Sequence, residues 1–130
     1  MDVTEDSPQA ILEDDLGEYN DIKWRLFSLQ LNGDYAEYPN TGAMIPGKGF
    51  WLIVKDAGKV IDTGPATSIT TDQPYSIDLN AGWTFIGNPF TFNVPLSQVS
   101  LENGDPLDIR SYTGSWGEHT SALRPFEGYA

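Results

Sequence analysis

The single histidine is the first place to look for catalytic chemistry. His119 follows Glu118 in a glycine-rich stretch, and a serine nucleophile activated by a histidine would have to use it. The sequence has no Gly-x-Ser-x-Gly motif to hold such a serine on a sharp turn. Pro-Gly-Lys-Gly at residues 46–49 precedes an apolar strand, whereas a phosphate-binding loop leads into a helix. We therefore expect no enzymatic activity and an exposed His119 in a loop.

Carboxylates are the second set of reactive groups. Nineteen Asp and Glu residues against seven Lys and Arg give a formal net charge of −12, which repels nucleic acid and anionic lipid. Acidic clusters at residues 2–6 and 13–15 carry the oxygen ligands that calcium prefers, but neither has the spacing of a calcium loop. Nothing selects a carboxylate pair for glycoside hydrolysis. We assign no metal site and no cofactor, with calcium as the alternative to solvated carboxylates.

Aromatic side chains are the remaining candidates, because they serve either a β core or a platform on which sugars stack. The tryptophans that fall within predicted strands, and are therefore expected in the core, are Trp24, Trp51 and Trp83. Trp116 has turn-forming neighbours and is the best candidate for exposure. With Tyr112 and Tyr35 it forms the candidate ligand-binding set. The alternative is that Trp116 packs within its own hairpin, as Tyr35 would in an earlier one.

The first half of the chain carries clear signals for local structure. Ser7, Pro8 and an apolar spacing that ends at Gly17 predict a short helix over residues 8–16. Residues 23–29 and 34–38 flank an Asn-Gly turn and predict a β-hairpin. Residues 50–54 are an apolar run, which predicts a strand covered on both faces.

The strand expected at the centre of the domain is Gly-Trp-Thr-Phe-Ile-Gly-Asn-Pro-Phe at residues 82–90. Its alternating pattern favours a β-strand, and Asn-Pro ends it. Further short strands are expected at residues 60–62, 68–70 and 75–79, the last with Tyr75, Ile77 and Leu79 pointing inward.

Beyond residue 90 the order of landmarks repeats. First comes a short amphipathic segment that matches the predicted N-terminal helix. Ile109-Arg110-Ser111-Tyr112 then matches Trp24-Arg25-Leu26-Phe27, and Pro-Phe-Glu-Gly-Tyr at residues 125–129 matches residues 46–50. This pattern indicates a degenerate internal duplication, with copies at about residues 1–81 and 82–130 of a single domain. We predict an all-β fold, either an antiparallel β-sandwich or an open barrel, with one short N-terminal helix.

The duplication also bears on the ends of the chain. Partner strands for residues 82–90 and 51–54 would lie before residue 1 and after Ala130. This favours a fragment of a larger protein over the alternative, in which the two halves close on each other. Open strand edges recruit other chains. We therefore expect self-association through the terminal strands, around residues 2–5 and 126–130, favoured by salt that screens the negative charge.

Residues 82–90 and the run Pro-Gly-Lys-Gly-Phe-Trp at residues 46–51 carry a family resemblance. The pair resembles the "GWNLIGNPF … PGKGYWV" β-domains of secreted and cell-surface bacterial proteins, including those exported by the type IX route. The resemblance covers most of the chain, but residues 124–129 depart from the second motif and the first copy lacks its own opening strand. It implies a non-catalytic module appended to a larger extracellular protein.

The expected function is therefore a spacer, adhesion or assembly element at the cell surface or outside the cell. A carbohydrate-binding module that uses exposed aromatics is the alternative, with polysaccharide or other surface proteins as partners. The chain has no cysteine, so its redox compartment is open. Its longest apolar run, residues 50–54, is too short to insert into a membrane.

Overall fold

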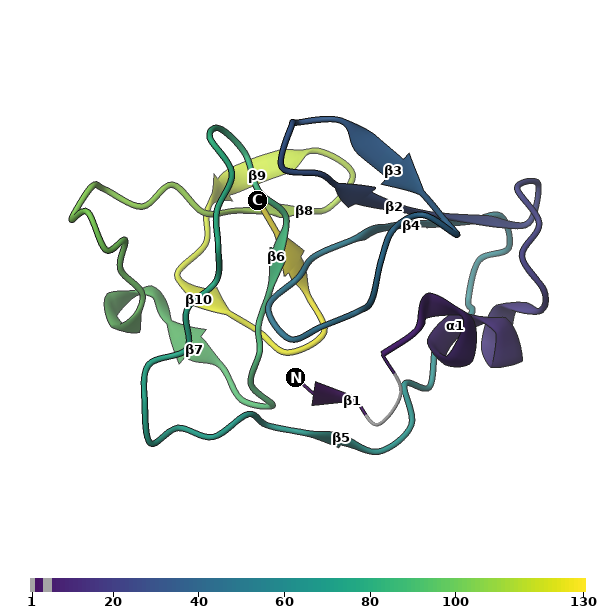
Figure 1. Cartoon of the computed structure of the whole chain (residues 1–130), viewed down its shortest axis with the longest axis horizontal. Coiled ribbons are helices and arrows are strands. Elements are labelled where there is room, and N and C mark those ends of the chain that lie inside the picture. The colour runs from purple at the N-terminus through teal and green to yellow at the C-terminus, as the bar shows by residue number, and fades with distance from the viewer. Residues whose placement is uncertain (1, 4–5) are drawn as a thin grey trace.

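The computed structural model describes residues 2–3 and 6–130, without the side chains of Asp2, Val3, Ala66 and Glu118. Within these residues the regular structure consists mostly of short antiparallel strands together with one α-helix (Figure 1). An all-β fold with a short N-terminal helix is therefore confirmed. Glu5 of the first acidic cluster and the side chain of Glu118 lie outside the described residues.

The first lobe contains α1 (Pro8–Leu16), β2 (Trp24–Leu29), β3 (Tyr35–Glu37) and β4 (Trp51–Val54). The predicted helix is confirmed, and the hydroxyl of Ser7 accepts a hydrogen bond from the backbone N–H of Ala10 as an N-cap. The hairpin is confirmed as well, in a sheet of order β3-β2-β4. One face of this sheet packs against α1. The core between them consists of Ile11, Leu12, Leu16, Trp24 and Leu26.

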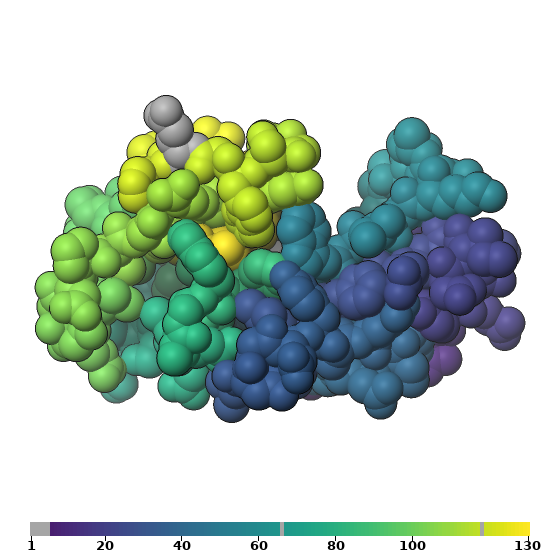
Figure 2. All heavy atoms as spheres, turned by 90° about the horizontal axis from the view of Figure 1, so that it is seen from above, coloured from purple at the N-terminus to yellow at the C-terminus, as the bar shows by residue number. Residues whose placement is uncertain are grey.

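The second lobe has its own sheet and its own core. Its elements are β6 (Ile86–Gly87), β7 (Val94–Pro95), the 3-10 helix η1 (Leu96–Gln98), β8 (Arg110–Tyr112), β9 (Trp116–His119), β10 (Ala122–Leu123) and β11 (Gly128–Tyr129). The main sheet has the order β6-β11-β8-β9, and β7 pairs with β10. Its buried core residues are Ile86, Ile109, Leu123 and Tyr129. Figure 2 shows the blue first lobe and the green and yellow second lobe at opposite ends of the molecule.

β6 joins the two lobes. It pairs with β11 on one side, and on its other side Ile86 forms an antiparallel bridge with Lys48. The backbone N–H of Gly49 donates to the carbonyl of Phe85 at 3.1 Å, and the N–H of Gly87 donates to Gly47 at 3.0 Å. The segment expected at the centre does lie where the lobes meet, as the edge strand of the second sheet, although only Ile86–Gly87 is strand.

Several strand predictions are wrong. Residues 60–62, 68–70 and 75–79 form no strand, and Tyr75 and Leu79 are exposed instead of pointing inward. Residues 82–85 also lie outside the sheet, so Trp83 is 53% exposed and is not a core residue. The β4 run is not covered on both faces, because the outward-pointing Ile53 is 55% exposed.

The terminal strands have partners within the chain. β1 (Asp2–Val3) pairs with β5 (Ala66–Thr67), and β11 lies between β6 and β8. Ala130 exchanges backbone hydrogen bonds with Arg110 at 2.8 and 3.0 Å. Self-association through these strands stays a prediction, but it would have to displace or extend these pairings.

Candidate aromatic binding face

Five aromatic rings gather on one face where the lobes meet, and we call this set the aromatic face. Its members are Tyr35, Trp51, Phe85, Tyr112 and Trp116. Trp51 contacts Tyr112 edge-to-face with ring centroids 4.6 Å apart, and it also contacts Phe85 and Trp116. The structure thus brings together all three residues of the candidate ligand-binding set, Trp116, Tyr112 and Tyr35. Phe85 connects Tyr35 to the others.

The strand registers explain this clustering. Trp51 lies opposite Phe27, and Tyr35 lies opposite Leu29, so these side chains share one face of the first sheet. The alternation of β2 sends Trp24 and Leu26 to the other face, where they form the core. In the second lobe, Tyr112 and Trp116 are directly paired across the β8–β9 hairpin.

The five rings differ in their exposure to solvent, and this difference divides them into an inner pair and an outer three. Tyr35 is 57% exposed, Trp116 is 46% exposed and Tyr112 is 42% exposed, whereas Trp51 and Phe85 are half-buried. The inner pair therefore packs the lobes together, and the outer three remain accessible to a partner. Exposed clusters of large apolar side chains are a common feature of interaction sites, so these three residues are the candidates for contact with a partner. The sequence left two alternatives for Trp116, packing within its hairpin or exposure to solvent. Both occur, because Trp116 contacts Tyr112 of the same hairpin and is partly exposed.

An arginine paired with a carboxylate flanks the aromatic face in each lobe. Arg25 binds both carboxylate oxygens of Glu37 at 2.6 and 2.7 Å and lies over the ring of Phe27. Arg110 binds Asp108 at 2.9 and 3.2 Å, and its guanidinium lies 6.0 Å from the ring centroid of Trp83. The first pair thus lies beside the register partner of Trp51, and Arg110 of the second precedes Tyr112 by two residues on β8. Both arrangements are bidentate and therefore fixed in geometry.

The Arg25–Glu37 pair makes a testable prediction about acid stability. Hydrogen bonds from Arg25 and then from Tyr19 lower the pKa of Glu37 from its ordinary 4.5 to about 2. The ionised carboxylate therefore stabilises the folded state above pH 4.5, and this contribution is lost as the pH falls from about 4.5 to about 2. We expect the difference in melting temperature between the wild type and Glu37→Gln to shrink to nothing across this window.

The effect is modest, because the side chains of Arg25 and Glu37 are 44% and 32% exposed. The control is Arg25→Gln, which removes the main partner and should reduce the same acid-dependent difference. A difference between wild type and Glu37→Gln that stays constant from pH 7 to pH 2 would contradict the assignment.

His119 ends β9 instead of lying in a loop, and its side chain is 62% exposed. Its Nδ1 lies 3.2 Å from Asp108, whose pKa is lowered chiefly by the hydrogen bond from Arg110. The predicted acidic cluster at residues 13–15 has structural contacts, since Glu13 accepts hydrogen bonds from the backbone of Tyr19 and the hydroxyl of Tyr38. In the part of the chain that the structure describes, no three His, Cys, Asp or Glu side chains are grouped to hold a metal ion.

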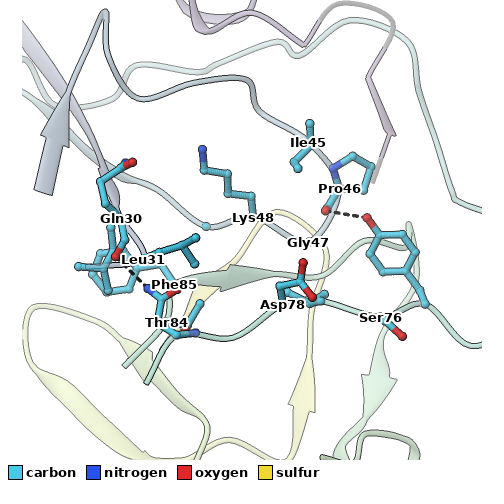
Figure 3. Close-up of a pocket in the computed structure, with 15 residues that line it drawn as sticks. Gln30, Leu31, Ile45, Pro46, Gly47, Lys48, Ser76, Asp78, Thr84 and Phe85 are labelled. Carbon is cyan, nitrogen blue, oxygen red and sulfur yellow. Dashed lines mark hydrogen bonds between the residues drawn. The ribbon is translucent and has the colours of Figure 1, made fainter. Parts of the chain in front are cut away.

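A hollow of about 410 Å³ borders the aromatic face at Phe85 (Figure 3). Its polar lining includes Gln30, Ser76 and Asp78. Lys48 extends along one side, where its ammonium donates to the carbonyl of Thr41 at 2.7 Å and burial lowers its pKa. A second hollow, of about 430 Å³, borders the face at Tyr112. Its other lining residues are Ser111, Thr113, Thr120, Arg124, Glu127 and Gly128.

Two members of the aromatic face were missed at the level of sequence. Trp51 was expected in the core, because its apolar run gives no sign that one face of β4 is open. Phe85 was expected within the central strand, although it lies just before β6. The only available signal was that aromatic residues lie close together in both segments: Phe50 and Trp51 at the start of one, and Trp83 and Phe85 in the other.

Comparison of the chain with protein-family models, curated proteins and solved structures found no match. Among the described residues, no helix has the length and apolar character needed to cross a membrane.

Proposed function

We propose that this chain is a non-catalytic module of a secreted or cell-surface bacterial protein, in which it serves as a spacer, adhesion or assembly element. The observation that carries the proposal is the aromatic face, which exposes Tyr35, Tyr112 and Trp116 together at the junction of the lobes. A module that serves only as a spacer does not need an exposed aromatic surface, so adhesion is the role that the geometry favours. The extracellular setting rests on the resemblance of residues 46–51 and 82–90 to surface β-domains.

The carbohydrate-binding alternative is the second candidate, and one observation specifically favours it. The three aromatic residues singled out as ligand-binding belong to one cluster with hydrogen-bonding groups on either side. Such a mixture of rings and polar groups is typical of small-ligand and sugar sites.

We also propose that the lobes are degenerate copies of one unit, about residues 1–81 and 82–130. The strand orders β3-β2-β4 and β9-β8-β11 support this. In each set of three strands the middle strand comes first in the chain, its hairpin partner comes second, and the third strand pairs with the other side of the middle strand. Matched positions also behave alike: Trp24 and Ile109 are buried, and Arg25 and Arg110 each pair with a carboxylate.

The turn before the third strand of each set, β4 in one and β11 in the other, adds a further parallel. Gly47 has φ +81°, and Phe126 at the matched position has φ +63°. A left-handed backbone is unusual for phenylalanine, so its recurrence at this position favours a shared ancestral turn. The finer architecture that we propose is a single curved array of order β3-β2-β4-β6-β11-β8-β9, of the open-barrel type, in which the bridge between Lys48 and Ile86 joins the two sheets.

The adhesion role predicts retention on the cell surface. Purified chain is expected to sediment with intact cells or envelope fragments of the source bacterium, and Trp116→Ala is expected to reduce the retained fraction several-fold because it removes an exposed ring of the face. The matched control is Phe126→Ala, which removes an exposed ring outside the face. Antibody against the chain should label intact cells. Retention that is equal for all three proteins, or labelling only after lysis, would reject the proposal.

A further inference from the structure

We propose that the aromatic face binds a neutral polysaccharide chain, one whose equatorial hydroxyl groups leave apolar C–H faces on its sugar rings. This inference rests on the adhesion role proposed above and names the ligand class for the same face. Three properties carry it: the rings are accessible, paired donors and acceptors flank them, and the charge of the chain excludes the acidic alternatives.

Accessible rings provide the stacking surface. A sugar ring with equatorial hydroxyls presents its C–H groups above and below, and these pack on aromatic rings without losing hydrogen bonds to water. Tyr35 at one side and Tyr112 with Trp116 at the other are exposed, with Phe85 between Tyr35 and Trp116. Their contacts with half-buried Trp51 and Phe85 hold them in place, which lowers the entropy lost on binding.

Fixed polar groups lie at both sides of these rings. Sugar hydroxyls both donate and accept, so a glycan site needs donors and acceptors side by side. Arg25 with Glu37 in the first lobe, and Arg110 with Asp108 in the second, supply both in a bidentate geometry. Because one pair lies on the sheet that carries Tyr35 and the other on the strand that carries Tyr112, the arrangement fits a chain of several sugars better than a single one.

The two hollows beside the aromatic face combine aromatic and polar lining residues as the face itself does. Phe85 borders one hollow with a polar lining that includes Gln30 and Asp78, and Tyr112 borders another with Thr113 and Glu127. The amide of Gln30 already donates to Ser28, and the carboxylate of Glu127 accepts from the hydroxyl of Tyr129, so both polar groups are held in place. Their remaining hydrogen-bonding capacity suits the hydroxyl groups of further sugar units better than an apolar protein segment. Figure 3 shows the carboxylate of Asp78 and the amide of Gln30 on opposite sides of the first hollow.

The net charge selects among polysaccharides. At −12, the chain repels uronate-containing and sulfated glycans as it repels nucleic acid. The arginines of the face do not offset this, because Arg25 and Arg110 are already neutralised by Glu37 and Asp108. The ligand is therefore uncharged.

Affinity electrophoresis tests this directly. The chain is run in native gels that contain xyloglucan, hydroxyethylcellulose or a soluble β-1,3-glucan, and in parallel gels that contain polygalacturonate or alginate. We expect retardation by at least one neutral polysaccharide and by neither acidic one. Trp116→Ala should raise the dissociation constant at least tenfold. Tyr35→Ala is the second variant, because its ring is the most exposed of the face and contacts only Phe85 among the five, so it should weaken binding several-fold with an unchanged melting temperature.

Phe126→Ala is the matched control and should bind as the wild type does. The inference is overturned if no neutral polysaccharide retards the wild-type chain, if acidic ones do so instead, or if Tyr35→Ala and Trp116→Ala bind unchanged. If these gels show no binding while retention on cells still depends on Trp116, the ligand is a surface protein, and only the adhesion role survives. If retention is also independent of Trp116, both proposals fail.

Discussion

Trp24→Ala is expected to lower the free energy of unfolding by about 3–5 kcal/mol, the usual cost of deleting a fully buried large aromatic side chain. Trp24 is 1% exposed and contacts both Tyr19 and Tyr38, with ring centroids 5.0 and 5.6 Å away. Its indole N–H also donates to the carbonyl of Gly17 at 3.1 Å, which ties the end of α1 to β2. Alanine would leave a cavity and an unpaired carbonyl together. Urea denaturation followed by far-ultraviolet circular dichroism measures the loss.

Trp83→Ala is the matched control, since it removes the same side chain from a 53% exposed site. Its main contact is a loose one with the guanidinium of Arg110, so we expect a change within about 1 kcal/mol. Equal losses for the two substitutions would mean that residues 82–85 are packed inside the protein after all, as the alternation of the sequence suggested.

The features that the sequence predicted well are those fixed by neighbouring residues. Ser7 and Pro8 specify where α1 begins regardless of what packs on it, and the Asn-Gly turn specifies the β2–β3 hairpin. The turn-forming neighbours of Trp116 predict its exposure, and Trp116 is indeed exposed as the first residue of β9. In each case the signal lies within a few residues of the position that it determines.

The features that were missed depend on contacts between distant segments. Alternation over residues 75–79 and 82–85 has the pattern of a strand, but the structure includes neither segment in a sheet, and Tyr75 and Trp83 are exposed. Trp51 belongs to the aromatic face because Phe85 and the β8–β9 hairpin of the other lobe lie against it. Nothing in the local sequence around Trp51 reports on that hairpin.

Gly49→Ala is expected to separate the two lobes. A Cβ atom at residue 49 would lie 2.8 Å from the backbone nitrogen of Ile86, 2.9 Å from its oxygen and 2.9 Å from the carbonyl carbon of Phe85. Backbone atoms cannot rotate away as a side chain can, so the pairing of Lys48 with Ile86 must open. We expect a loss of roughly 3 kcal/mol, at the upper end for overpacking. The near-ultraviolet circular dichroism of the aromatic face should fall as well, because Gly49 lies two residues before Trp51 and Phe85 directly precedes Ile86.

Gly128→Ala is the matched control, because residue 128 is the counterpart of Gly49 in the proposed second copy. Its Cβ would meet no atom within 4 Å, although β11 also pairs with β6. We expect a stability change within about 0.5 kcal/mol and an unchanged near-ultraviolet spectrum. The contrast separates two explanations of the recurring glycine: if both substitutions were equally harmful, the glycine would be required by the turn that the copies share. Harm confined to Gly49 means that the requirement comes from β6, which packs so closely only against the first lobe.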